Sequence, residues 1–159
     1  MLFRSNADIP KHVAYGLFFG EMAAFKKKAE ENERQGLDGS SFRGHHKQRA
    51  GLNDQQAQVL DSIANDCNQA VITLNERARK IINKDRARHP HGRLNEGEPL
   101  PLPPDELRTL EDQRTATVLE AREKLRQAFG EKEFRRFDDF VQQDIASRTK
   151  AIPRNGKHQ

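Results

Sequence analysis

Between Asn53 and Arg88, apolar or small residues recur every three or four positions. This spacing places them along one face of an α-helix and leaves the other faces to charged residues. At 1.5 Å per residue, a helix over residues 54–88 is on the order of 50 Å long, which is longer than a domain of this size can surround. A second helix of a hairpin, or a dimer partner, must therefore cover this apolar seam, which consists of Leu60, Ile63, Cys67, Ala70, Leu74, Ala78 and Ile81.

The composition supports a helical protein with a thin core. Hydrophobic residues make up 34% of the 159 residues, whereas compact domains usually reach roughly 45–50% with glycine included. A sheet that is buried on both faces needs more apolar residues than this, but long helices with one narrow apolar stripe do not. We therefore expect a single all-α domain with no sheet.

Capping residues and breaks in the apolar pattern give the helix boundaries. Asn53 followed by Gln56 is typical of a capping box, and Gly130 separates two amphipathic segments. Residues 37–51, which with the adjacent Gly36 include four glycines, are expected to form a long loop with one helical turn around Phe42. We expect four helices, of which the second and third pair as an elongated antiparallel hairpin across the proline-rich connector 89–104. The expected helices cover residues 10–35, 54–88, 105–129 and 131–147 of one domain at 1–147.

The net charge of +4 comes from the C-terminal end of the sequence. Residues 148–159 contain four basic and no acidic residues, so residues 1–147 hold 24 residues of each sign. We interpret 148–159 as a basic flexible tail. A duplex-binding protein usually gathers its positive charge on one folded face, because phosphate neutralisation supplies most of the affinity. Nucleic-acid binding is therefore an alternative that is not favoured; it would use Lys80, Lys84 and Arg88 together with the basic loop of Arg43, Lys47 and Arg49.

Motifs for catalysis and cofactor binding are absent. The sequence has no P-loop, no dinucleotide-binding glycine pattern and no nucleophile elbow. Cys67 is the single cysteine and lies on the apolar seam, which predicts a buried, unreactive thiol and excludes an intrachain disulfide. We therefore expect a protein that is not an enzyme and needs no cofactor.

Aromatic and basic residues are candidates for contact with a protein partner. Phe18, Phe25 and Phe140 exceed what one apolar stripe per helix requires. Arg114 interrupts the apolar stripe of 105–129 opposite Ala78; either its stem packs and its guanidinium reaches an acidic neighbour, or it binds a partner's carboxylate. Four further basic residues share an arc of about 80° beside the seam, where they either pair with acids of the next helix or meet an anionic partner; they are Arg77, Lys80, Lys84 and Arg88.

The loop histidines raise a further alternative, a metal-responsive module. The candidates are His45, His46, His89 and His91, and neither pair has the i, i+4 helical spacing that directs two imidazoles at one metal. Surface histidines that titrate near neutral pH are the simpler interpretation.

The apolar segments do not predict a membrane span or a secretory signal. No stretch approaches the roughly 18 apolar residues of a spanning helix. The most apolar segment, 13–25, is followed by Lys26, Lys27 and Lys28, whereas a secretory signal has its basic residues first. The default expectation is a cytoplasmic protein, or a periplasmic one if a signal has been removed.

Two short segments resemble a known chaperone motif. Leu52-Asn53-Asp54-Gln55-Gln56 resembles the Leu-Thr-x-x-Gln motif of the Spy-like periplasmic chaperones, with asparagine in place of threonine. The segment Phe129-Gly130-Glu131-Lys132-Glu133 looks like a degenerate second copy. The resemblance implies a dimeric, ATP-independent chaperone that holds clients on a concave surface of basic and apolar patches.

These observations together favour a non-catalytic helical protein that acts by contact with other proteins. We expect a chaperone-like protein, or an assembly or stress-response subunit, that binds a protein partner or client and forms a homodimer. The length of the seam and the surplus aromatic residues carry this expectation.

Overall fold

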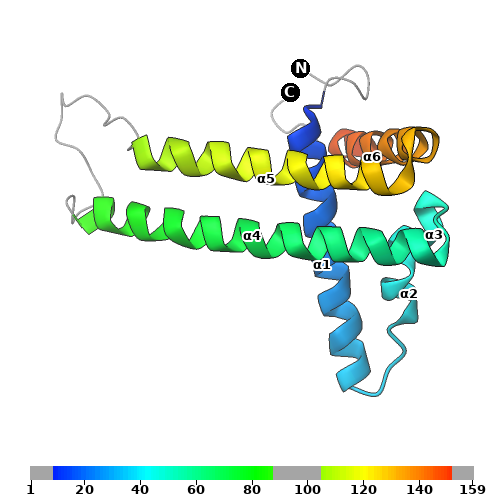
Figure 1. Ribbon diagram of the computed structural model, residues 1–159. Helices are drawn as coiled ribbons and strands as arrows, with labels where there is room; N and C mark the ends of the chain where they lie inside the picture. Colours follow the sequence, from blue (N-terminus) through cyan, green and yellow to red (C-terminus); the bar gives the residue numbers. More distant parts are fainter. Residues whose placement is uncertain (1–8, 88–104, 152–159) are drawn as a thin grey trace, which may run out of the picture.

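The computed structural model describes residues 9–87 and 105–151, and within them all regular structure is helical. The elements are α1 (Lys11–Arg34), α2 (Ser40–Arg43), α3 (His45–Ala50), α4 (Asp54–Ala87), α5 (Asp105–Phe129) and α6 (Glu131–Ala151) (Figure 1). The expectation of an all-α fold is confirmed. The expected number of four helices is wrong, because the described residues form six.

The two additional helices lie in the segment that the glycines predicted to be a loop. The carboxylate of Asp38 accepts hydrogen bonds from the backbone N–H and the hydroxyl of Ser40, at 2.9 and 3.0 Å, at the start of α2. α3 ends at Gly51, whose φ of 67° lies in the left-handed region. Both helices are too short to show an apolar period, so the glycine content was the stronger signal.

The ends of α4 and α5 follow the capping residues. The Asn53 N–H donates to Gln56 Oε1 at 3.0 Å, and the Gln56 N–H donates to Asn53 Oδ1 at 2.8 Å, which confirms the capping box. Gly130, with a φ of 83°, alone separates α5 from α6.

α6 continues four residues beyond its expected end at 147. The prediction of a flexible tail over 148–159 is therefore wrong for residues 148–151. The reason is that Arg148 turns back onto the protein and pairs with Glu21 of α1 and Asp144 of α6. Residues 152–159 lie outside the described part of the chain.

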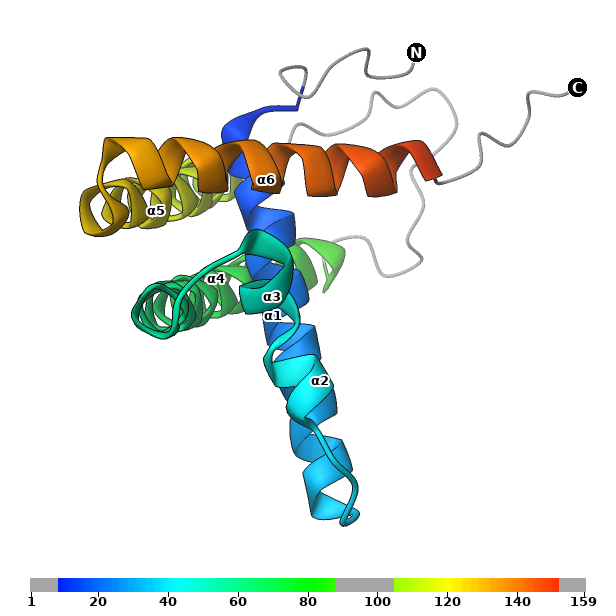
Figure 2. The ribbon, with the colours of Figure 1, turned by 90° about the vertical axis from the view of Figure 1, so that its right-hand side faces the viewer.

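α4 and α5 lie side by side and run in opposite directions, and α1 crosses one side of this pair (Figure 1). α6 turns away from α5 and packs across the upper part of α1 (Figure 2). α2 lies along α1, and α3 follows it near the start of α4 (Figure 1). Asn68 of α4 donates through Nδ2 to the Phe19 carbonyl oxygen of α1 at 3.0 Å, which fixes the crossing of these two helices.

The core lies where α1 crosses the other long helices. Phe18 packs edge to face against Phe137 and Phe140, with ring centroids 5.7 and 6.0 Å apart. The largest fully buried side chains are Tyr15, Phe18, Phe19, Leu60, Leu125, Phe137 and Val141.

The far part of the α4–α5 pair extends beyond this core. In α4 the buried residues are Leu60, Ala64 and Cys67, and in α5 they are Val118, Ala121 and Leu125. We call residues 70–87 of α4 and 105–117 of α5 the arm. α1 lies against the base of the arm near Val71 and Arg114, and no third helix among the described residues packs along the rest of it (Figure 1). None of the described helices is long and apolar enough to cross a membrane.

Candidate functional site

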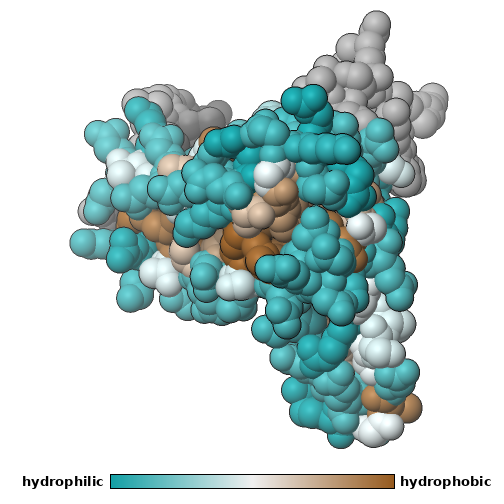
Figure 3. All heavy atoms as spheres, turned by 45° about the vertical axis from the view of Figure 1, so that its right-hand side comes forward, coloured by the Kyte–Doolittle hydropathy of each residue, from teal (hydrophilic) through white to brown (hydrophobic). Residues whose placement is uncertain are grey.

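Two open grooves mark the surface of the α4–α5 pair. The first lies between α4 and α5 and has a volume of about 450 Å³. Figure 3 shows hydrophobic surface exposed between rows of hydrophilic side chains on the visible face. We call the groove between α4 and α5 the face groove. Its lining residues are Ala70, Thr73, Leu74, Arg77, Gln113, Ala116, Thr117 and Glu120.

The second groove, the corner groove, lies where α1 crosses the pair and has a volume of about 300 Å³. Val13 and Leu17 of α1 are 39% and 55% exposed at its edge, which is high for large apolar residues. Val71 of α4 and Val118 of α5 line it from the hairpin, and Arg114 lies among them. This groove therefore combines exposed aliphatic surface with one cation.

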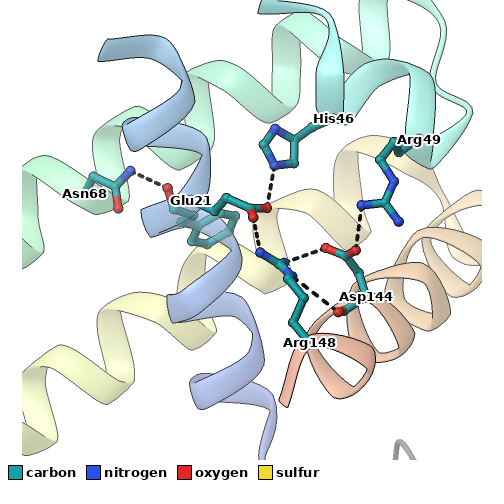
Figure 4. Close-up of polar contacts among 7 residues, drawn as sticks. Glu21, His46, Arg49, Asn68, Asp144 and Arg148 are labelled. Carbon is teal, nitrogen blue, oxygen red and sulfur yellow. Dashed lines mark hydrogen bonds and ion pairs between the residues drawn. The ribbon is translucent and has the colours of Figure 1, made fainter. Parts of the chain in front are cut away.

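A polar network lies close to the core on the opposite side of α1 from Asn68 (Figure 4). The Glu21 carboxylate contacts His46 Nε2 at 2.9 Å through one oxygen and the Arg148 guanidinium through the other. Asp144 binds Arg148 Nη2 at 2.6 Å and Arg49 Nη1 at 2.9 Å. Because the side chain of Asp144 is only 4% exposed, its charge depends on these two arginines. The network joins α1, α3 and α6.

Burial lowers the pKa of His46 below its ordinary value; Asp144 and Asp61 oppose this effect and Arg49 adds to it. A lowered pKa means that the folded state favours the neutral imidazole. The folded state therefore keeps its full stability above the unfolded pKa of about 6.5, and it loses stability as the pH falls below that value and the imidazole becomes protonated. The imidazole is therefore neutral at pH 7.

We predict that His46 titrates with a midpoint below 6.5. The measurement is an NMR titration of the imidazole Cε1 proton, with the signal assigned by its loss in the His46→Gln variant. A midpoint above 7 would mean that the contact with Glu21 outweighs burial, and would contradict this description.

A half-buried carboxylate lies in the cluster formed by α1, α5 and α6. Asp138 accepts hydrogen bonds from Tyr15 Oη at 2.7 Å, Lys11 Nζ at 2.8 Å and Arg122 Nε at 3.1 Å. The Arg122 guanidinium also lies 5.2 Å from the centre of the Phe134 ring. The carboxylate thus binds three donors from α1 and α5, and the cluster holds these helices to α6.

The structure changes the interpretation of the aromatic candidates. Phe18 is fully buried, so its expected role in partner binding is wrong; packing against α6 and His46 of α3 uses its whole side chain. Phe25 is half-buried against the rings of His45 and Phe42, with centroids 4.5 and 5.8 Å apart. Phe140 is half-buried against the core. All three serve the packing of this chain.

The basic candidates lie mainly on the arm. Arg77 lines the face groove, and Lys80 and Lys84 are exposed on α4. Arg114 donates to Glu111 Oε1 at 2.7 Å and lies 3.4 Å from Asn75 Oδ1, not opposite Ala78, so the two helices are offset from the expected register by about one turn. Arg88 lies outside the described residues.

The loop residues of the nucleic-acid alternative are engaged in ion pairs, whereas its residues Lys80 and Lys84 are exposed on α4 and make no ion pair within the described residues. Arg43 makes a two-pronged contact with Glu33, at 2.6 and 2.7 Å. Lys47 pairs with Asp54, and Arg49 pairs with Asp144. Because each loop cation has its own carboxylate, the loop segment offers no concentrated positive face, and this argues against phosphate binding.

The histidine alternative gains no support from the described residues. His45 and His46 lie on α3 with their ring centres 4.8 Å apart, but His46 Nε2 contacts Glu21. No group of three or more histidine, cysteine, aspartate or glutamate side chains suited to a metal ion occurs within 9–87 and 105–151. His89 and His91 lie outside those ranges.

Cys67 fits the expectation of an inert thiol. It is buried on the seam, and burial raises its pKa to about 11, so it stays protonated at neutral pH.

Sequence reasoning missed both polar clusters and the corner groove. Glu21 offered a signal, because it is a charge within the most apolar segment of the chain. Its partner Arg148 lies 127 residues away, and no local pattern predicts that contact. The exposure of Leu17 likewise depends on how far α4 and α5 cover α1.

No protein family, characterised protein or solved structure matches this chain to a significant degree.

Proposed function

We propose that this chain is a non-catalytic, chaperone-like or assembly protein that binds other proteins at the corner groove. The observation that carries the proposal is the exposure of Val13 and Leu17 at the edge of an apolar groove. Large aliphatic side chains gathered at a concave surface are typical of sites that receive a partner's apolar side chains.

The partner that fits this groove is an unfolded or extended segment with one or two aliphatic or aromatic side chains. The groove volume of about 300 Å³ suits so small an anchor. Arg114 lies among the lining residues, already paired with Glu111, so a partner carboxylate would have to compete for it. A Spy-like activity agrees with this proposal, but it rests on the short resemblance alone.

The distribution of titratable groups supports a binding role over a catalytic one. The half-buried carboxylate Asp138 and the buried carboxylate Asp144 are paired with cations and line neither groove. An active site usually brings perturbed titratable groups into a cleft where a substrate reaches them. Cys67 lines the corner groove, but its raised pKa keeps the thiol protonated and so unsuited to act as a nucleophile.

The proposal is tested by the aggregation of insulin after reduction, followed by light scattering. The wild-type chain should suppress the scattering at near-stoichiometric amounts. Leu17→Asp should need about tenfold more protein for the same effect, since it removes an apolar anchor and adds a charge.

Leu37→Asp is the matched control for this substitution. Leu37 is 57% exposed, as Leu17 is 55% exposed, but it lines neither groove. The control should suppress aggregation like the wild type. Equal loss in both variants, or no suppression by the wild type, would refute the proposed site.

A further inference from the structure

The face groove is a separate, uncovered surface. α1 crosses one side of the α4–α5 pair, and on the other side no described helix packs along the arm (Figures 1 and 2). Ala70 and Ala116 are exposed in the groove and leave it shallow. Two helices alone do not bury a seam of this length, so a further pair of helices is the natural cover.

Charges of opposite sign lie on the two helices toward each end of the groove. Two contacts set the alignment of the helices: Cys67 Sγ of α4 lies 4.0 Å from the Thr117 carbonyl oxygen of α5, and Arg114 Nη1 of α5 lies 3.4 Å from Asn75 Oδ1 of α4. Because both helices rise 1.5 Å per residue in opposite directions, these contacts place Lys84 within about two turns of Glu106 along the helix axes, and Asp66 within about two turns of Lys124. At 100° per residue, these four charges share the helix faces of Ala70 and Gln113, which line the groove.

These four charged residues are available to a partner. All of them are exposed. None of them takes part in an ion pair among the described residues, although opposite charges lie on the neighbouring helix.

We propose that a second copy of this chain covers the face groove, with each α4 lying against α5 of its partner. A two-fold axis parallel to the helices produces this arrangement and makes every neighbouring pair of helices antiparallel. Lys84 then meets the partner's Glu106, and Asp66 meets the partner's Lys124. In this arrangement the positive residues of the face-groove surface meet negative residues of the same surface on the partner.

In this proposal the occupant of the face groove is a second copy of the chain. The dimer does not depend on client binding at the corner groove. The bundle leaves the corner groove open, since that groove lies on the side crossed by α1. A homodimer formed in this way presents two corner grooves.

Charge reversal followed by sedimentation velocity at low salt tests the interface. The wild type should be a dimer of the 18.2 kDa chain at tens of micromolar. Lys84→Glu and Glu106→Lys should each raise the dimer dissociation constant about tenfold or more, because each change places like charges together at two symmetric positions. The double variant K84E/E106K should restore it to within about threefold of wild type.

Two further variants complete the experiment. Arg86→Glu makes the same charge change as Lys84→Glu, but at 100° per residue it lies on the opposite face of α4, so it should leave the dimer intact. Ala116→Arg fills the groove and should give a monomer.

A monomeric wild type, single reversals without effect, or a double variant that stays monomeric would overturn the interface. Insulin aggregation reports on Leu17 separately, so the two proposals fail independently.

Discussion

Phe18→Ala is expected to lower the free energy of unfolding by roughly 3–5 kcal/mol. Phe18 is fully buried, and its ring lies 5.1 Å from His46 and 5.7 Å from Phe137, between centroids. Helices α3 and α6 both pack on this ring, so neither can move to fill the space without losing other contacts. Since typical domains are stable by only about 5–15 kcal/mol, this variant should be close to unfolding.

Urea unfolding followed by far-ultraviolet circular dichroism measures this effect. Leu17→Ala is the matched control, because Leu17 is the adjacent residue and is 55% exposed. Its free energy of unfolding should change by no more than about 0.5 kcal/mol. Similar losses in the two variants would show that α1 does not cross the core in the orientation described.

Asp138→Ala is expected to destabilise the protein by about 1–3 kcal/mol, the usual effect of leaving a buried hydrogen-bonding group without its partner. The substitution leaves the buried Tyr15 hydroxyl without its acceptor and removes a partner of Lys11 and Arg122. The adjacent Asp139 is exposed, so Asp139→Ala should change stability by less than about 0.5 kcal/mol.

The same cluster gives an expected pH dependence. Burial alone would raise the pKa of Asp138, but the hydrogen bonds from Arg122, Lys11 and Tyr15 outweigh it and hold the pKa below its usual value. A carboxylate with a lowered pKa stabilises the fold above its unfolded pKa of about 4, and the stabilisation is lost as the pH falls through the folded value. Asp138→Ala should therefore lose less stability than the wild type on acidification from pH 5. Parallel acid-unfolding curves would contradict the assigned hydrogen bonds.

Local signals in the sequence predicted the long elements well. The capping box of Asn53 and Gln56 and the break at Gly130 act through neighbouring residues, so the chain itself contains the whole cause. The expected helical turn around Phe42 corresponds to α2, whereas α3 was missed because its stability comes from side-chain contacts with α1, such as those of His46 with Glu21 and Phe18.

Long-range packing explains the errors about the site. The surplus of phenylalanines in α1 predicted an exposed binding face, but α1 contacts α4, α5 and α6 and needs more than one apolar stripe. Phe18 is consequently buried, whereas Leu17, one residue earlier, is exposed. A single helical period cannot distinguish these two residues before the neighbours of α1 are known.

The most direct test of a protein-binding corner groove is methyl NMR of the chain with a reduced insulin chain added. We predict that the methyl signals of Val13 and Leu17 shift on addition, while those of the exposed Leu37 stay in place. Perturbation of Leu37 without Val13 and Leu17, or no change in any methyl signal, would contradict a binding function at this groove.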